Sequence, residues 1–470
     1  MAKKKKKKGM FSKLTSKGII LTIQLIASAV FLGYIYVLKM LPTRYYAILI
    51  IVLIALLLLE MIWITSGARR KRRTGKGFRI FISKFVSVAL SALLIVGSVY
   101  ASQGNSFLSN ITSAFTQTRV IAVYAMKQGK INKVEDLKGK TIGVENKTSV
   151  SSITDALAQV QEKIGKEPEK KNYSDYADLA DALYKGEVDA IIVGQEYKSM
   201  LEANHDSFDD ETKIIKSYEY ESKLSVTTKQ TNVTENPFTI YVTGIDTYGS
   251  VSTVARSDVN LIVTVNPKTK QILMTSIPRD CEIQLHKNGK MDKLTHTGIY
   301  GTSETISTIE DFLDVEINYF ARTNFSGMTN IVDALGGVTI DSDYKFTTLH
   351  GNYNIVKGEN QMDGDKALCF VRERYSLPNG DFDRGKNQQK LLKAMLEKAM
   401  SPKIITNFNN ILTAIEGSFE TDMSSKEIKS LLNMQLNDMS DWTVYNVQVE
   451  GEGYKTSKTA SMYGTEVYVM

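Results

Sequence analysis

Three long apolar runs near the N-terminus constrain the fold of this chain more than any other feature. Residues 18–38 contain no charged side chain, residues 46–65 contain only Glu60, and residues 80–101 contain only Lys84. About 20 apolar residues in a helix span the hydrocarbon core of a bilayer, so the sequence predicts three transmembrane helices. Lys84 lies near a helix start and can extend to the interface. Glu60 lies within two turns of the end of its run, and we interpret it as an interfacial carboxylate rather than a functional intramembrane acid.

Positive charge gathers around these runs. Residues 1–103 carry 12 Lys, 6 Arg and one acid, which exceeds the net charge of +7 for all 470 residues, so residues 104–470 are net acidic. Basic residues cluster at 3–8 and at 69–79, before the first run and between the second and third. By the positive-inside rule, residues 1–17 form a cytoplasmic tail and the chain after about residue 103 is extracellular. We favour this topological role over binding of DNA or anionic lipid, and two further spans argue against a cleavable signal peptide.

The alternation of strand-like and helix-like segments in residues 104–220 predicts a small α/β domain. It begins with a polar linker that runs to residue 118. The phrases VEDLKGKTIGV and LADALYKGEVDAIIVG resemble one lobe of the periplasmic solute-binding proteins. Such binders need two lobes to close on a ligand, so we interpret this region as an accessory domain rather than a solute receptor. The expected elements are a strand at 120–124, helices at 151–164 and 176–184, and a strand at 188–193.

A polar stretch at 221–237, closed by Pro237, is the predicted linker to a second domain at 238–470. This domain mixes strands and helices over enough residues for one α/β core. The expected strands are 239–242, 259–265, 271–277, 319–323, 338–340 and 442–449, and the expected helices are 303–313, 325–335, 406–415 and 425–436.

Residues 369–389 carry a set of basic and amide side chains. Arg372 and Arg374 are two apart on a strand-like run, ALCFVRERY, so a strand would point both to one face and Glu373 to the other. Guanidinium forks match phosphate oxygens. The alternative is that these arginines form ordinary surface ion pairs.

A helix is predicted after the Pro-Asn-Gly turn signal that follows this run. Asp383 stands where an N-cap carboxylate is expected. Arg384 and Gln388 are four apart and share a face of that helix. The strand, the turn and the helix start would then bring Arg372, Arg374, Arg384 and Gln388 to one place.

Acidic and basic residues also lie at the ends of predicted strands. Asp246 ends the first strand of the second domain, Arg256 and Asp258 open the next, and Arg279 follows the third with Asp280 beside it. Ligands of α/β sheets bind at such ends. Two aspartates supply hard oxygen ligands for Mg²⁺, or Mn²⁺, with water and a substrate phosphate completing the shell.

Several separated motifs, in order, resemble the LytR–CpsA–Psr family of membrane-anchored cell-wall transferases over about residues 239–400. Three spans before an accessory domain resemble its capsule branch. The matching segments are GIDTYG at 244–249, RSDVNLIVTVNP at 256–267, SIPRD at 276–280, FSGMTNIVDALGGV at 325–338, GENQMDGDKALCFVRER at 358–374 and DFDRGKNQQ at 381–389.

The resemblance implies an α-β-α domain with a mixed central sheet, so the soluble part is α/β throughout. It implies Mg²⁺-dependent transfer of a glycopolymer, in this branch a capsular polysaccharide, from an undecaprenyl diphosphate carrier to peptidoglycan at the outer face of the plasma membrane. Capsule-synthesis proteins would be further partners. The implied metal ligands are Asp246 and Asp258, and the implied diphosphate ligands are Arg279, Arg372, Arg374, Arg384 and Gln388.

The implied reaction is a displacement at the anomeric or the phosphoryl centre, in which a peptidoglycan hydroxyl attacks and the polyprenyl phosphate or diphosphate leaves. Arg256 would organise the aspartates or contact phosphate, and Asp246, ahead of Asp383, is the candidate base. The lipid would lie in an apolar groove of the core. Two other functions stay open: a phosphatase acting on the same carrier, and a sensor that regulates capsule synthesis.

The remaining reactive side chains carry less information. Cys281 and Cys369 either form one disulfide or are two buried thiols. The four histidines have no zinc-ligand spacing. Gly139-Lys140-Thr141 leads into a strand and lacks the upstream glycine of a phosphate-binding loop, so we predict no nucleotide hydrolase.

Overall fold

The computed structural model describes residues 16–39, 41–75, 77–111, 116–146, 151–224, 228–399, 411 and 415–470. The chain divides into two compact units, residues 1–110 with 424–441 and residues 111–423 with 442–470. The second unit holds both soluble regions. We call residues 116–223 the accessory lobe, and residues 228–423 with 442–470 the C-terminal domain.

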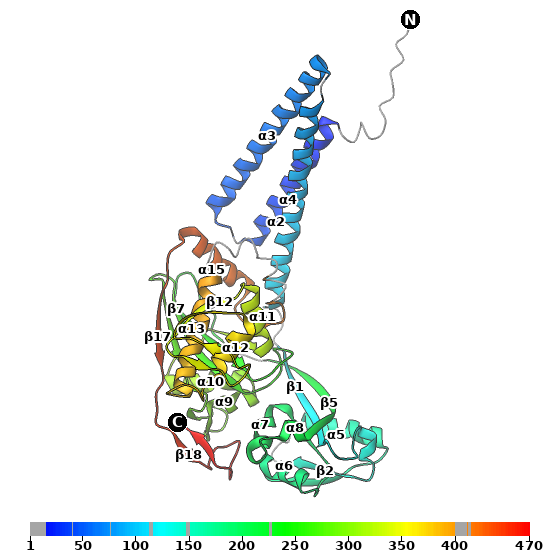
Figure 1. Cartoon of the computed structure of the whole chain (residues 1–470), viewed down its shortest axis with the longest axis vertical. Coiled ribbons are helices and arrows are strands. Elements are labelled where there is room, and N and C mark those ends of the chain that lie inside the picture. Colours follow the sequence, from blue (N-terminus) through cyan, green and yellow to red (C-terminus); the bar gives the residue numbers. More distant parts are fainter. Residues whose placement is uncertain are drawn as a thin grey trace. The chain divides into compact units, whose positions relative to one another are not determined.

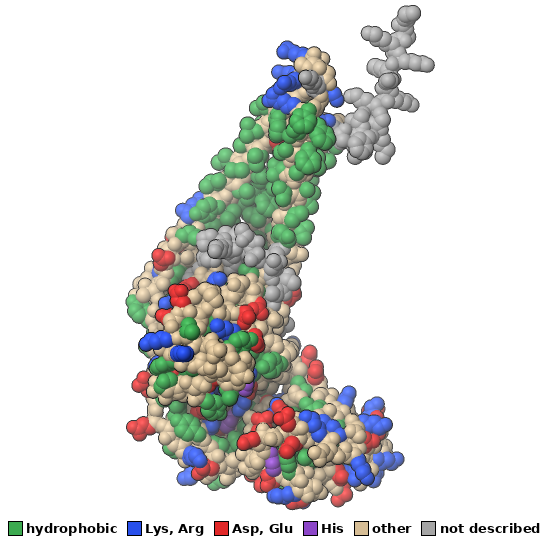
Figure 2. Space-filling model, viewed as in Figure 1, with side chains coloured by type: hydrophobic (Ala, Val, Ile, Leu, Met, Phe, Trp, Pro, Cys, Tyr) green, Lys and Arg blue, Asp and Glu red, His purple; other side chains and the backbone are tan. Residues whose placement is uncertain are grey.

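The first unit contains three long helices, α2 (Lys17–Leu38), α3 (Thr43–Thr74) and α4 (Phe78–Ile111) (Figure 1). All three have the length and composition to cross a membrane, as predicted. Figure 2 shows apolar side chains covering the visible surface of these helices, with Lys and Arg gathered where α3 meets α4. An apolar surface of this extent is stable in contact with lipid rather than water.

Two of these helices run further than predicted. α3 continues through Arg69–Arg73, which were expected in a loop, because cations are favourable at the negative end of a helix. It ends at Gly75, whose φ of 71° gives the left-handed turn typical of a helix end. α4 continues to Ile111, well into the expected linker.

Glu60 packs between the helices, and its predicted interfacial placement stays a prediction. Its side chain is only 5% exposed and lies beside Gln24 of α2 and Ser87 of α4. The Ser87 hydroxyl donates to Gln24 Oε1 at 2.6 Å. α3 extends 14 residues beyond Glu60, and its last turns carry the basic residues Arg69–Arg73.

The accessory lobe is a five-stranded mixed sheet with helices on both faces, as its alternating pattern predicts. The strand order is β3-β2-β4-β1-β5. Successive side chains of β1 alternate between two cores, Ile121 and Val123 packing with α5 and Ala122 and Tyr124 packing with α6. The principal elements are β1 (Thr116–Met126), β2 (Thr141–Glu145), α5 (Ser151–Ile164), β3 (Glu169–Tyr173), α6 (Tyr176–Tyr184), β4 (Ala190–Gly194), α7 (Lys198–Leu201), α8 (Phe208–Glu211) and β5 (Thr212–Lys223).

The C-terminal domain is built on a six-stranded mixed sheet of order β16-β11-β6-β7-β8-β17, which confirms the expected architecture. β11 runs parallel to β6 and β17 parallel to β8, while β6, β7 and β8 form an antiparallel meander. The sheet strands are β6 (Phe238–Ile245), β7 (Ser257–Asn266), β8 (Gln271–Ser276), β11 (Tyr319–Asn324), β16 (Phe419–Thr421) and β17 (Thr443–Gln448).

Helices cover the two faces of this sheet. On one face lie α9 (Leu294–Thr297) and α10 (Thr302–Leu313), and a second layer contains α11 (Phe325–Ala334), α12 (Gly364–Arg372) and α13 (Asp381–Ala399). Small strands join these layers: β9 (Glu282–Gln284), β10 (Met291–Lys293), β12 (Val338–Ser342), β13 (Phe346–Thr347), β14 (Asn354–Ile355) and β15 (Gly358–Met362). The result is the α-β-α order expected for this domain.

The sheet buries a core against each layer because strand side chains alternate between faces. Tyr241, Ile262 and Phe320 pack with residues of α10 in a core cluster. Their strand neighbours Val242 and Leu261 line a cavity on the other face together with residues of α11, α12 and α13. The α10 face is therefore filled and the other face is hollow.

The end of the chain departs from the prediction in two ways, and a third prediction there is not tested. α15 (Ser425–Asp438) groups with the membrane helices in the first unit rather than with the C-terminal domain. The strand expected to be last, β17, is followed by the pair β18 (Tyr454–Thr456) and β19 (Val467–Val469). The helix predicted at 406–415 lies mostly outside the described residues.

Candidate active site

The hollow face of the sheet contains a cavity of about 310 Å³. Most of its lining surface is apolar, and both the strands and the helices contribute to it. Its apolar residues are Val242, Val259, Leu261, Phe325, Met328, Leu368, Val371, Leu391, Leu392 and Met395. Such a lining favours a hydrocarbon over a polar ligand.

Four arginines and one glutamine line the same cavity, and they are the predicted diphosphate ligands: Arg279, Arg372, Arg374, Arg384 and Gln388. Arg384 and Gln388 lie one turn apart on α13, as their spacing predicted. A single cavity thus combines an apolar interior with a group of guanidinium donors.

The predicted strand at Arg372 is wrong, because residues 364–372 form the helix α12. Asp363 caps this helix by accepting a hydrogen bond from the Lys366 amide at 2.9 Å. β-Branched and aromatic residues that suggested a strand are instead buried by the helix against its neighbours. Arg372 ends the helix, Glu373 follows in extended backbone, and Arg372 and Arg374 both still reach the cavity.

Glu373, between these two arginines, points to the interior of the protein and holds the turn. Its carboxylate accepts hydrogen bonds from the backbone amides of Leu349, Arg374 and Ser376 at 2.5, 2.9 and 3.0 Å. Burial would raise the pKa of Glu373, but these amide donors outweigh it and lower the pKa below its usual value. This residue therefore positions the two arginines without lining the cavity.

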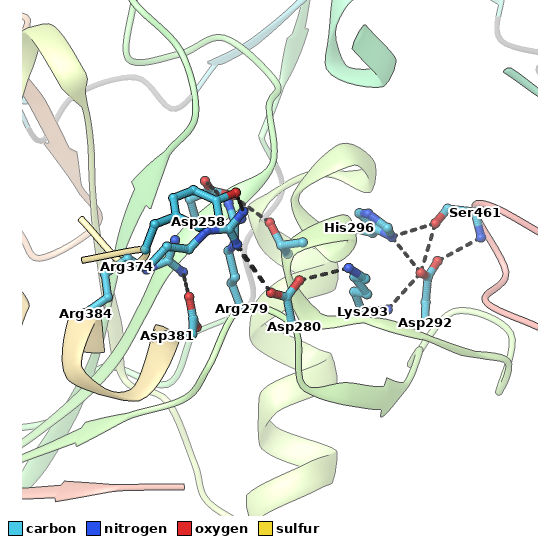
Figure 3. A network of polar contacts seen from close by, with 12 residues as sticks. Asp258, Arg279, Asp280, Asp292, Lys293, His296, Arg374, Asp381, Arg384 and Ser461 are labelled. Carbon is cyan, nitrogen blue, oxygen red and sulfur yellow. Dashed lines mark hydrogen bonds and ion pairs between the residues drawn. The ribbon is translucent and has the colours of Figure 1, made fainter. Parts of the chain in front are cut away.

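Asp258 and Arg279 form the buried centre of the arginine group (Figure 3). Arg279 Nη1 donates to Asp258 Oδ2 at 2.6 Å, and Thr295 Oγ1 donates to Asp258 Oδ1 at 2.9 Å. Burial would raise the pKa of Asp258, but the guanidinium groups of Arg279, Arg256 and Arg384 hold it well below the usual range. Asp258 is therefore ionised at neutral pH.

The group carries more guanidinium donors than its acids satisfy. Arg384 is buried and pairs with Asp381 at 2.6 Å, and burial followed by the repulsion of Arg279 lowers the pKa of Arg384 (Figure 3). The Nε atoms of Arg279 and Arg384 are buried and have no hydrogen-bond partner among the described residues. Buried unsatisfied donors are costly unless a ligand completes them. A bound anion would supply the missing acceptors.

Arg372 and Arg374 are held in a different way. The Arg372 guanidinium lies 4.2 Å from the Phe325 ring centroid, and Arg374 lies 4.6 Å from that of Tyr375. Arg372 Nη1 also donates to the Tyr248 hydroxyl at 3.4 Å, and Arg374 Nη2 donates to the Tyr375 hydroxyl at 2.5 Å. A guanidinium has five N–H donors, so each arginine keeps others for a ligand in the cavity.

Asp246 and Arg256 lie beside this cavity and line a neighbouring one. Their side chains form an ion pair, and the Asp246 amide donates to the Arg256 carbonyl oxygen at 3.0 Å. Burial would lower the pKa of Arg256, but the attraction of Asp258 and Asp246 raises it instead. Arg256 thus faces both predicted metal ligands.

Asp383 is placed apart from the other predicted site residues. Its side chain is 2% exposed and lines neither cavity. The carboxylate accepts from the Asn379 amide at 3.0 Å and from Lys386 Nζ at 3.2 Å. It lies in the first turn of α13 rather than at the N-cap position, and there it anchors the preceding turn. Asp246 is therefore the better-placed candidate base.

Asp246 and Asp258 are the carboxylates that could hold a metal. Among the described residues, no three His, Cys, Asp or Glu side chains gather in a metal-binding group. Zn²⁺ requires three or four protein ligands, whereas Mg²⁺ accepts one or two carboxylates and completes its shell with water and substrate phosphate. Both aspartates are already paired, Asp246 with Arg256 and Asp258 with Arg279, so a metal would have to share these carboxylates with the arginines.

A second polar cluster, at the right of Figure 3, contains Ser461, His296 and Asp292. Ser461 Oγ lies 2.7 Å from His296 Nδ1, and Asp292 Oδ1 lies 2.8 Å from the same nitrogen. A nucleophilic triad uses both ring nitrogens, one toward the serine and one toward the acid. Here one nitrogen faces both, so the cluster fastens the C-terminal segment to β10 and α9.

The two cysteines are free and buried, so of the two alternatives left open by the sequence the structure has two buried thiols. Cys281 belongs to the filled-face core. Burial raises the pKa of Cys281 to about 11 and also raises that of Cys369, so neither thiol is reactive at neutral pH.

Residues 197–468 match the family model described as LytR_cpsA_psr family, which is more than half of the chain. The chain belongs to the LytR–CpsA–Psr family. Residues 100–240 match a second model, described as NMT1/THI5 like. The family match spans the whole C-terminal domain and includes every predicted site residue, whereas the second match covers the accessory lobe.

Named relatives share the family region. The polyisoprenyl-teichoic acid–peptidoglycan teichoic acid transferase TagU of Enterococcus faecalis is 34% identical over 200 residues, which cover 42% of this chain and 65% of that protein. The TagU of Bacillus cereus is 32% identical over 222 residues, covering 47% and 71%. The solved structure of B. subtilis TagU is 29% identical over 50% of this chain and 90% of that one, with a TM-score of 0.39.

Sequence analysis missed three contributors to this family site. Tyr248 accepts a hydrogen bond from Arg372 at 3.4 Å, and Phe325 lies under the same guanidinium. Thr295 donates to Asp258. Tyr248 stands within the family motif GIDTYG and Phe325 within FSGMTNIVDALGGV, so the motifs were a signal for both. Thr295 lies in none of the motifs, and only the fold reveals it.

Proposed function

We propose that this chain transfers a glycopolymer from an undecaprenyl diphosphate carrier to peptidoglycan, outside the plasma membrane and with Mg²⁺. The N-terminus would lie in the cytoplasm, and the chain after about residue 103 would be extracellular. The polymer would be a capsular polysaccharide, a choice supported by the three apolar helices and the additional lobe before the family domain.

One observation carries this proposal: an apolar cavity of about 310 Å³ has unsatisfied arginine donors in its wall. A polyprenyl diphosphate combines a hydrocarbon chain with two adjacent phosphates and requires both features. The names of the relatives from E. faecalis and B. cereus describe transfer from a polyisoprenyl-linked polymer to peptidoglycan, which supports the same reaction class.

The arginines would act by position and charge. Arg279 and Arg384 are held by Asp258 and Asp381, so their donors are oriented before the substrate binds. Arg372 and Arg374 would close on the diphosphate from the end of α12. Together they stabilise negative charge on the leaving phosphate as the acceptor hydroxyl attacks.

Asp246 would accept the proton of that hydroxyl. The ion pair with Arg256 keeps the Asp246 carboxylate oriented. When bound by Asp246 and Asp258, Mg²⁺ would neutralise phosphate charge as a Lewis acid.

The full chain, purified in detergent, tests the proposal. Mass spectrometry should find a co-purified polyprenyl phosphate, and Arg372→Ala should weaken binding of polyprenyl diphosphate by about 10- to 100-fold, since a hydrogen bond to a charged group contributes about 1.5–3 kcal/mol. Lys345→Ala, an exposed change elsewhere in the domain, is the control. Equal affinity of wild type and Arg372→Ala would refute the site. Release of free polymer without an acceptor would identify a phosphatase instead.

A further inference from the structure

A second cavity, of about 430 Å³, lies between the accessory lobe and the C-terminal domain within the second compact unit. The lobe contributes Lys198, Glu202 and Asp209 to its wall, and the C-terminal domain contributes Asp246, Arg256 and Arg372. Charged and polar groups from both regions therefore face one space. This cavity has a larger volume than the apolar one, and more of its lining is polar.

The two cavities adjoin each other. Phe325 and Arg372 line both of them, and the Arg372 guanidinium lies over the Phe325 ring. A diphosphate held by Arg372 would therefore have the apolar cavity on one side and the polar cavity on the other. Whatever is attached to the phosphates opposite the lipid would extend into the polar cavity.

The lobe side of this cavity is fastened to the loop that carries the site. The Thr118 amide donates to the Ser252 carbonyl at 2.8 Å, and the Val254 amide donates to the Thr118 carbonyl at 2.8 Å. These bonds join β1 of the lobe to the segment between Asp246 and Arg256. The lobe core also includes Ile299 of the C-terminal domain.

Most charged groups of the polar cavity are paired within it, while Glu196 of its lining pairs with Arg119 outside it. Lys198 forms ion pairs with Asp209 and, at 3.7 Å, with Glu202, and Arg256 pairs with Asp246. No surplus of arginines comparable to that of the apolar cavity occurs in its lining. Paired carboxylate and ammonium groups at partly exposed positions offer many acceptors and donors to a ligand rich in hydroxyl groups, and the exposed Tyr248 ring offers a face for a sugar ring.

We propose that this cavity is a saccharide-binding subsite of the active site, with the accessory lobe as its outer wall. The inference rests on the proposed function. The saccharide has two possible sources of the same chemistry: the first sugars of the carrier-linked polymer and the glycan strand of peptidoglycan.

Two lobe variants test this subsite in the full chain. Glu202→Gln removes a charged acceptor, and Ser199→Trp fills the cavity from α7 without changing charge. Glu169→Gln is the matched control, since Glu169 is exposed on the edge strand β3 of the same lobe and lies outside the cavity. Melting temperature in detergent verifies that each variant is folded.

Three ligands separate the outcomes: bare polyprenyl diphosphate, the same lipid carrying a short saccharide, and a soluble peptidoglycan glycan fragment. We expect both lobe variants to bind bare lipid as wild type does and to lose roughly 10-fold or more in affinity for one saccharide ligand. Loss for the lipid-linked saccharide identifies the donor sugars, and loss for the fragment identifies the acceptor.

Wild-type affinity of both folded variants for both saccharide ligands would overturn the subsite. Failure of wild type to bind bare polyprenyl diphosphate would instead overturn the proposed function. The two failures are therefore distinguished within one set of titrations.

Discussion

The two faces of the C-terminal sheet use the same strands for opposite purposes. On the face of α10, Tyr241, Ile262 and Phe320 belong to a filled core, and Tyr241 and Phe320 are fully buried. Val242, the residue after Tyr241 on β6, and Leu261, the residue before Ile262 on β7, face the cavity instead. On the filled face Tyr241 donates to Asn260 Oδ1 at 2.6 Å and Arg322 pairs with Glu420 at 2.6 Å, whereas the hollow face places four arginines around one open cavity.

This difference shows how stability and ligand binding are divided within one domain. Close packing on the filled face supplies the free energy of folding. The hollow face gives up part of that free energy, since its cavity and its buried cations are costly without a ligand. Variants on the two faces should therefore have different effects.

The largest effect is expected from Phe320→Ala. It removes a fully buried ring from the filled face and should lower the free energy of unfolding by about 3–5 kcal/mol. Chemical denaturation of the full chain in detergent measures this. Phe325→Ala, at the edge of the cavity and only partly buried, should cost less than half as much and instead weaken lipid binding. Equal destabilisation by both would remove the distinction between the faces.

Glu373→Gln should have the next largest effect. Gln keeps one acceptor oxygen but loses the charge that holds three amides, so stability at pH 7 should fall by about 1.5–3 kcal/mol. The folded-state pKa of Glu373 lies below its unfolded value of about 4.3. Its contribution is therefore complete above that value and is lost as pH falls through the folded-state pKa.

Denaturation at a series of pH values tests this prediction. Wild type should lose stability below about pH 4.3 more steeply than Glu373→Gln does. Glu359→Gln, an exposed change on β15, should follow the wild-type curve. Parallel curves for wild type and Glu373→Gln would contradict the role assigned to this carboxylate.

Ile262 and Leu261 are adjacent on β7 and face opposite sides of the sheet, so the same substitution at each should affect either stability or lipid binding. Ile262→Phe overpacks the filled face and should cost about 1–3 kcal/mol without changing lipid affinity. Leu261→Phe projects into the cavity, so it should cost less than about 1 kcal/mol and lower affinity for polyprenyl diphosphate at least several-fold. The same pattern from both substitutions would show that the cavity is not the lipid site.

The smallest effect is expected from reduction. Cys281 and Cys369 are free, so a reducing agent should leave the melting temperature unchanged. An alkylating reagent should modify both thiols only after unfolding, because burial raises the pKa of each. A mass two hydrogens lighter before reduction would reveal the disulfide.

Alternation and turn residues predicted most strands of the two sheets, since a half-buried strand repeats every two residues, but they gave no strand at β3, β5 or β16. They were not enough for residues 364–372. There the run Leu368 to Val371 is apolar whether it forms a strand or a buried helix, and packing against α11 and α13 decides for the helix. The N-cap at Asp363 was the local signal that favoured the helix.

The site was predictable in composition but not in shape. Family motifs carry Asp258, Arg279, Arg372 and Arg384, and the fold brings these four to one cavity. Its hollow interior depends on the spacing of α11, α12 and α13 from the sheet, which no single stretch of sequence encodes. The same holds for the polar cavity, whose walls come from residues up to 248 positions apart, Tyr124 and Arg372.

The position of the arginines at one end of an apolar cavity bears on turnover under the proposed function. Substrate and spent carrier share the same hydrocarbon chain, so both would make the same apolar contacts. They differ in the attached saccharide and in the charge presented to Arg279, Arg372, Arg374 and Arg384. Exit of the spent carrier, rather than bond cleavage, would then be the step that weaker arginine contacts accelerate, and the protein would remain occupied by lipid between rounds.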